Sequence, residues 1–254
     1  MKKIINNITF FVASILIFSA CETDNYDGPD AHISGRILDH NGNLFNTEQG
    51  SSNMRIKMEE LSWAKGDTSI AIIPTYLNVK IDGTYNNTKI FKGQYRMTPI
   101  EGAFYPYDEE GEIVDIKGSV KKDFVVTPYL EVEWVREPQL TDDNRITASI
   151  IFNYNTPPSD TITRPTATEV RLFISSTQYV GNNNYYSDII AAGMANAGII
   201  TLNAINNGGG REISLRTSRS VKYTDTRYYV RVGVRCNDQY QKYSYTSIIP
   251  IDVP

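Results

Sequence analysis

The fold is decided by residues 228–236, which read YYVRVGVRC. Apolar side chains occupy every second position from Tyr228 to Cys236, and the positions between are mostly arginine or glycine. Successive side chains of a β-strand point to opposite faces, so this alternation predicts a strand with one face in a core. We expect Cys236 to pack on that face as a small apolar residue, not to act as a reactive thiol.

The same alternation recurs at residues 54–59, 130–134 and 169–174. Turn pairs such as Asn41-Gly42 separate the segments, and such pairs favour tight hairpins between antiparallel strands. Only residues 187–197 fit a helix, with Ser187 as a possible N-cap and Gly198 as its end. The sequence therefore predicts an all-β protein.

Composition limits the partners. The 254 residues include 25 Lys and Arg against 29 Asp and Glu, and they carry no basic run. Binding of nucleic acid by phosphate neutralisation is not expected from such a chain. A 41% hydrophobic content at this length suits one large domain or two ordinary ones.

The N-terminus resembles a bacterial lipoprotein signal. Lys2 and Lys3 precede a short apolar run that ends in FSAC at residues 18–21, with Phe18 where leucine is usual. The run is shorter than the roughly 20 apolar residues of a membrane-spanning helix. We interpret residues 1–20 as a cleaved signal peptide and Cys21 as the lipidated residue. The alternative is an ordinary secretory signal in which Cys21 is incidental.

Residues 21–30 contain little that a core could bury and are expected to be a tether. Glu22 and Asp24 are similar to the export signal that sends such lipoproteins to the outer face of the outer membrane. The alternative is that these acidic residues have no signalling role and belong to a tether that is simply solvated.

We divide the rest of the chain near residue 128. Residues 31–128 are turn-dense, as in a small β-sandwich, and residues 129–254 contain longer strands. In the second part, Tyr228 followed by alternating valines resembles the penultimate strand of a fibronectin/immunoglobulin-like sandwich, where a tyrosine closes a corner. We therefore expect two β-sandwich domains in tandem.

Several strings carry a family resemblance: GRILDHNGNL at 35–44, DGTY at 82–85, FKGQY at 91–95, NYDGPD at 25–30 and VTPYL at 126–130. The first three resemble hairpins of transthyretin-type, carboxypeptidase-regulatory-like sandwiches. Together the strings resemble an uncharacterised family of two-domain lipoproteins, domain of unknown function 3823, encoded beside starch-utilisation-type outer-membrane transporters. This resemblance implies a surface lipoprotein that helps a transporter or a partner lipoprotein to capture glycans.

No catalytic or metal-binding motif stands out. His32 and His40 are the only histidines and are poorly spaced for a metal, and no Gly-x-Ser-x-Gly elbow occurs. The acids 108–110 lie in one loop, whereas glycoside hydrolysis needs two carboxylates across a cleft. We expect no enzyme activity, no metal and no cofactor.

Aromatic loops offer a candidate glycan site, because sugar rings pack on aromatic faces and amides match their hydroxyls. The candidate contacts lie in two polar loops and are Tyr105, Tyr107, Tyr179, Asn183, Asn184, Tyr185 and Tyr186. Three further tyrosines flank the last predicted hairpin, at positions 240, 243 and 245. Any of these rings could instead be an ordinary strand residue.

Asp160-Thr161-Ile162 resembles an acceptor for O-glycosylation at Thr161. Two functions remain open. The first is a non-catalytic glycan-binding accessory of a polysaccharide-utilisation transporter. The second is a structural module that docks on the transporter or a partner lipoprotein without binding sugar.

Overall fold

The computed structural model describes residues 28–50, 53–67, 69–190, 197–203 and 206–254. The expected signal peptide, Cys21 and most of the tether lie outside these residues. Within them, no helix combines the length and the apolar character that crossing a membrane requires.

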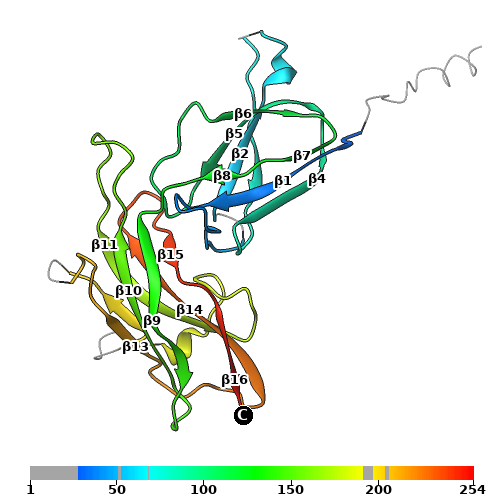
Figure 1. Cartoon of the computed structure of the whole chain (residues 1–254). Helices are drawn as coiled ribbons and strands as arrows, with labels where there is room; N and C mark the ends of the chain where they lie inside the picture. The colour runs from blue at the N-terminus through cyan, green and yellow to red at the C-terminus, as the bar shows by residue number, and fades with distance from the viewer. Residues whose placement is uncertain (1–27, 51–52, 68, 191–196, 204–205) are drawn as a thin grey trace, which may run out of the picture.

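The first half of the chain forms two four-stranded sheets (Figure 1). One has the order β4-β1-β7, with β8 also paired to β1, and comprises β1 (Ala31–Leu38), β4 (Thr84–Ile90), β7 (Ser119–Lys121) and β8 (Phe124–Val125). The other has the order β3-β2-β5-β6 and comprises β2 (Arg55–Glu60), β3 (Thr75–Asn78), β5 (Gly93–Ile100) and β6 (Glu112–Ile116). A 3-10 turn, η1 (Leu61–Ala64), follows β2.

The second half forms two further sheets. The order β13-β10-β9 joins β9 (Leu130–Leu140), β10 (Ile146–Tyr154) and β13 (Ile213–Arg216). The order β12-β11-β14-β15, with β16 also paired to β14, joins β11 (Ala167–Ser175), β12 (Ile199–Thr201), β14 (Thr226–Cys236), β15 (Tyr243–Tyr245) and β16 (Ile249–Val253). The expectation of an all-β protein with tandem β-sandwiches is confirmed. The closer types assigned to each sandwich stay predictions.

The expectation of a helix at 187–197 is wrong from Ile190 onward, as far as the described residues reach. Only η2 (Ser187–Ile189) is helical, and Ile190 is extended, with φ −123° and ψ 117°. Both isoleucines, Ile189 and Ile190, are buried. Burial of two adjacent side chains suits an extended exit from the turn better than a helix with one apolar face. Residues 191–196 of the expected helix lie outside the described residues.

Strand β14 confirms the predicted core face, since its alternate residues from Tyr228 to Cys236 are buried. The Tyr228 hydroxyl also closes a corner, accepting from the amide of Tyr223 at 2.8 Å and donating to its carbonyl at 3.2 Å. The opposite face is not in solvent, because Arg231 is only 1% exposed. A Cβ at Gly233 would lie 2.9 Å from ring atoms of Tyr243 and of Tyr245, so glycine makes room for the aromatic layer on this face.

The two halves touch near residue 128. In the described sheets, β1–β8 pair only with one another, as do β9–β16. Across the division, an isolated bridge joins Phe104 to Pro128, and the Tyr105 hydroxyl donates to the carbonyl of Asn155 at 3.0 Å. The boundary at residue 128 stays a prediction, since the chain is packed continuously through it.

Candidate functional site

A groove of about 1010 Å³ lies where the two domains meet. Its first-domain wall is the end of β5 and the segment that follows, residues 98–109. Its second-domain wall combines the loop between β10 and β11, residues 162–166, with the turn between β14 and β15, residues 237–240. Both domains are therefore needed to form this groove.

Tyr240 is the most accessible ring of the groove, with 39% of the residue exposed. Tyr240 lies close enough to the first domain to affect Arg55 on β2. The pKa of Arg55 is raised mainly by a hydrogen bond to Glu101, and Tyr76 and Tyr240 add smaller contributions. Tyr107 is half-buried in the opposite wall, where its hydroxyl donates to Glu112 at 2.5 Å. The groove thus has an aromatic side chain on each domain.

The turn that carries Tyr240 is held by two polar side chains. The Asp238 carboxylate accepts from the backbone amide of Tyr240 at 2.9 Å, and burial raises the pKa of Asp238. Asn237 accepts from the amide of Thr166 at 2.7 Å and so fixes the neighbouring 162–166 loop. Short side-chain-to-backbone bonds of this kind hold a loop in one conformation.

Other polar groups of the groove remain at its surface. Arg164 and Gln239 are exposed, and the Arg164 guanidinium stacks over the ring of Tyr154 at 4.4 Å. On the first domain, Arg55 donates two hydrogen bonds of 2.6 Å to the Glu101 carboxylate, which lines the groove. The groove therefore offers amide and guanidinium donors beside aromatic rings.

The structure separates the tyrosines and asparagines expected to bind glycan. Tyr105 and Tyr107 line the groove, whereas residues 179–186 form a different loop in the second domain. Tyr105 is only 2% exposed, and its ring packs edge-on against Tyr129. Its expected role as an exposed sugar contact is wrong, because the second domain covers it.

The 179–186 loop makes mostly internal contacts. Tyr185 packs edge-on against Phe173 at 5.3 Å, and its hydroxyl accepts from Arg171 at 3.1 Å. Tyr186 shares a hydrogen bond of 2.8 Å with Ser176. Both rings are half-buried, and their binding of glycan stays a prediction.

The two asparagines lie at the tip of the same loop. Asn184 donates to Thr177 Oγ1 at 2.7 Å and to the carbonyl of Tyr179 at 3.2 Å, which closes the loop on itself. The backbone amide of Asn183 donates to the carboxylate of Glu48 in the first domain. The tip therefore serves as a contact between domains. Tyr179, 49% exposed, and the side chain of Asn183 remain accessible, and their binding of glycan stays a prediction.

Glu48 and Arg231 form the centre of that contact. The Tyr245 hydroxyl donates to Glu48 at 3.1 Å, and the Arg231 guanidinium stacks over the Tyr245 ring at 3.5 Å. Arg231 also donates to the carbonyl of Thr47 at 2.8 Å. A Cβ at Gly181 would lie 2.6 Å from Arg231 and 2.9 Å from Glu48, so glycine is required beside them. No local sequence pattern indicates this pair, because its members lie in different domains.

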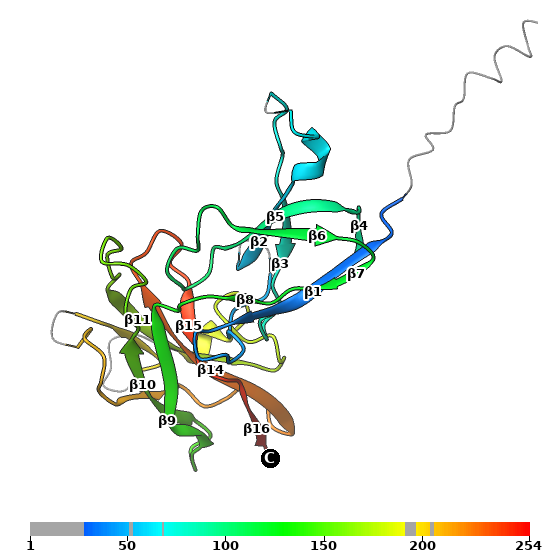
Figure 2. The same ribbon diagram turned by 45° about the horizontal axis from the view of Figure 1, so that its top comes forward.

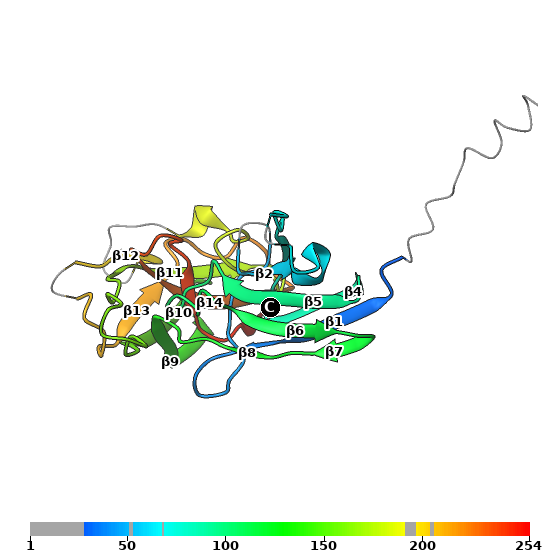
Figure 3. The same cartoon turned by 90° about the horizontal axis from the view of Figure 1, so that it is seen from above.

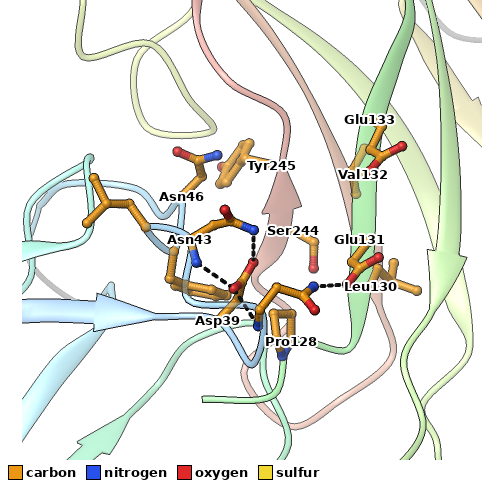
Figure 4. Close-up of a pocket in the computed structure, with 13 residues that line it drawn as sticks. Asp39, Asn43, Asn46, Pro128, Leu130, Glu131, Val132, Glu133, Ser244 and Tyr245 are labelled. Atoms are coloured by element: carbon orange, nitrogen blue, oxygen red, sulfur yellow. Dashed lines mark hydrogen bonds between the residues drawn. The ribbon is translucent and has the colours of Figure 1, made fainter. Parts of the chain in front are cut away.

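A smaller hollow of about 220 Å³ lies where the turn after β1 meets β9 (Figure 4). Asp39 Oδ1 accepts from the amides of Asn41 and Asn43, and the Asn41 side chain donates to Glu131 at 3.0 Å. Asp39 thus holds its own turn together, while Glu131 joins the two domains. In the described part of the chain, no group of three or more His, Cys, Asp or Glu could hold a metal ion.

Thr161 lies exposed in the loop between β10 and β11, where its hydroxyl is 2.9 Å from that of Ser159. The site is accessible, and its glycosylation stays a prediction.

The comparisons bear on the first domain. Residues 31–127 match the model of the N-terminal domain of DUF3823, a protein family of unknown function. The first domain matches the DUF3823 family. The resemblance to DUF3823 is confirmed for this domain, and its carboxypeptidase-regulatory-like type stays a prediction. None of the curated proteins matches the chain.

Solved structures share the fold over both domains. A DUF3823 family protein of Bacteroides uniformis is 24% identical, with a TM-score of 0.70, over 89% of this chain and all of its own. A second protein of that organism, described as a “putative carbohydrate binding protein”, is 23% identical, with a TM-score of 0.68 and the same coverage. A DUF3823 family protein of Parabacteroides merdae is 22% identical, with a TM-score of 0.65 and again the same coverage. At these identities the likeness establishes the fold.

Proposed function

We propose that the protein is a non-catalytic, glycan-binding lipoprotein on the outer face of an outer membrane. It serves as an accessory of a polysaccharide-utilisation transporter, and the groove between the DUF3823-like domain and the second domain holds the glycan. The observation that carries the proposal is the exposed Tyr240 ring, which a braced turn holds in a groove formed by both domains.

The chemistry of the groove suits a sugar. The apolar face of a pyranose packs on an aromatic ring, and its hydroxyls pair with amides and with guanidinium groups. Tyr240 supplies the ring, while Gln239 and Arg164 supply exposed polar groups beside it. Because Asp238 and Asn237 already order this wall, binding costs less conformational entropy than it would with a free loop.

The groove favours binding over hydrolysis. Its carboxylates among the described residues are Glu101, Glu109 and Asp238. Glu101 is held by two hydrogen bonds from Arg55, and Asp238 by the backbone of its own turn. Glu101 is therefore not free to act as one of two opposed catalytic carboxylates. The fold relative from B. uniformis described as carbohydrate-binding also supports this proposal.

The test is calorimetry of the full chain with a panel of neutral polysaccharides, comparing the native protein with Tyr240→Ala and Gln239→Ala. We expect Tyr240→Ala to weaken binding by roughly tenfold, as for loss of one aromatic contact. Tyr179→Ala tests the other candidate loop, since Tyr179 is an exposed tyrosine outside the groove, and it should leave affinity unchanged if the groove holds the glycan. Binding of no glycan would favour the docking module, and equal binding by Tyr240→Ala would reject the groove.

A further inference from the structure

One end of the first domain carries unusually exposed apolar side chains. Trp63 is 67% exposed, Ile73 is 84% exposed, and Phe91 is about half exposed. Trp63 and Ile73 come from the arm between β2 and β3, residues 61–74, and Phe91 from the turn between β4 and β5. We call these three residues, with Ile70, the apolar tip.

The apolar tip is one surface. Trp63, Ile73 and Phe91 line a common hollow of about 440 Å³, whose other lining residues include Ile72 and Leu77. The arm rises from the first domain on the side away from the second domain (Figure 2). Contiguous exposed apolar groups of this kind mark a surface with a partner, because their exposure to water is unfavourable.

The chain enters the first domain beside this tip. Ala31, the first residue of β1, pairs with Ile90, which immediately precedes Phe91. Asp30 forms an ion pair of 2.6 Å with Lys92, the residue that immediately follows Phe91. The start of β1 lies at the end of the molecule far from the second domain (Figure 3). The segment that leads from Cys21 therefore arrives at the apolar tip.

The length of that segment limits where the tip can be. An extended chain spans at most about 3.5 Å per residue, so the nine residues from Cys21 to Asp30 reach at most about 32 Å. A lipid on Cys21 would keep Asp30, which lies beside Phe91 of the tip, within that distance of the bilayer at all times. Such tethering raises the effective concentration of a weak second contact to roughly the millimolar range.

We propose that the apolar tip inserts into the lipid surface as a second membrane contact. This inference rests on the lipid anchor of the proposed function, and it is independent of the glycan groove. Trp and Phe favour the boundary between headgroups and acyl chains, so the tip would add its own apolar burial to that of the lipid on Cys21. The nearby charges of Lys65 and Lys89 are offset by Asp67 and Glu60, so apolar burial drives the contact.

Fluorescence tests the contact directly. The chain has two tryptophans, so Trp134→Phe leaves Trp63 as the single reporter. The chain from residue 21 onward, without the expected signal peptide, carries Cys21→Ser and a hexahistidine after residue 21, and it is bound to phosphatidylcholine–phosphatidylglycerol vesicles (3:1, roughly) that contain nickel-chelating lipid. Insertion about 5–10 Å into the headgroup boundary should shift Trp63 emission to the blue, and brominated phosphatidylcholine should quench it roughly twofold.

Two sets of variants distinguish insertion of the apolar tip from non-specific adsorption of the protein to lipid. Ile73→Ser with Phe91→Ser should abolish the blue shift of Trp63, whereas Ile113→Ser, at an exposed isoleucine of the same domain outside the tip, should preserve it. Unchanged Trp63 emission on the vesicles would overturn the proposal and favour a protein partner for the tip. Flotation of the otherwise native chain carrying Ile73→Ser and Phe91→Ser with the same vesicles, without nickel lipid, reports the lipid anchor without the tip, so failure of the anchor is distinguished from failure of the tip.

Discussion

The carboxylate of Glu48, in the first domain, accepts a 3.1 Å hydrogen bond from the hydroxyl of Tyr245, in the second, and both residues are buried. Arg231 stacks over the same tyrosine ring and is itself buried. The two sandwiches are therefore joined by a desolvated polar cluster. Because each charge depends on partners in the other domain, the groove between them keeps a defined shape.

Glu48→Ala should destabilise the whole protein. Removing one member of a buried charged cluster leaves the other uncompensated, at a cost of about 3 kcal/mol. Urea unfolding of the variant should show a lower midpoint. Glu137→Ala, at an exposed position of β9, is the control and should leave the midpoint unchanged. Equal midpoints for the two variants would contradict the role given to Glu48.

Tyr186→Ala should lower the melting temperature without changing glycan affinity. Its ring contacts those of Tyr223 and Tyr228, and its hydroxyl bonds to Ser176, so truncation removes packing worth roughly 2 kcal/mol. Thermal unfolding and calorimetry on the same preparation measure both properties. A large loss of affinity with unchanged melting would restore the 179–186 loop as the binding site.

Asp238→Asn should change how stability depends on pH. Burial raises the pKa of Asp238, so the folded state holds the proton more tightly than the unfolded state does. The carboxyl group therefore contributes most to stability below its unfolded pKa of about 3.9, and that contribution is lost as pH rises through the folded pKa.

At neutral pH the ionised, partly desolvated carboxylate is unfavourable, and an amide at this position removes that cost. The variant should gain in urea midpoint over the native chain at pH 7, and the gain should shrink as the pH approaches 4, roughly the range in which aspartate is protonated. A gain of the same size at both pH values would show that burial of the charge is not its cause.

Cys236 should be unreactive in the folded protein. It is buried, and burial raises the pKa of its thiol to about 12, so almost no thiolate forms at pH 8. In a Cys21→Ser chain, where it is the single cysteine, Ellman's reagent should detect no thiol until denaturant is added. Rapid labelling under native conditions would show that β14 opens locally.

Cys21→Ala should abolish metabolic labelling with palmitate and leave an uncleaved or soluble chain, because no other residue of the expected signal carries a thiol. The matched control is Cys236→Ala, which should be labelled like the native protein. Equal labelling of the native chain and Cys21→Ala would reject the lipidation site.

Local patterns predicted the strands well. The alternation from Tyr228 to Cys236 gave the strand and its core-facing side, because that information resides in neighbouring residues. The burial of Arg231 on the other side could not be predicted, since its guanidinium packs over Tyr245 and donates to the carbonyl of Thr47, which is distant in sequence. A basic residue between valines is normally the sign of a solvent-facing side.

The candidate site was predictable only in part. Aromatic residues in polar loops indicated Tyr107 and the region of Tyr240, but the groove is assembled from three segments distant in sequence. Tyr105 shows the limit of the argument, because its loop looks solvent-exposed until the second domain covers it. Which rings remain accessible depends on how the domains dock, and no local pattern encodes that.

Strand β1 connects the N-terminal segment to the fold, and it pairs with β4 on one edge and with β7 and β8 on the other. A pull along β1 loads the hydrogen bonds on both edges together, in shear, and does not break them one after another. Force transmitted from a tether at Asp30 would therefore be resisted by the β1–β4, β1–β7 and β1–β8 hydrogen bonds together. A protein held at a cell surface by this end could bear drag on a bound polymer without unfolding from its point of attachment.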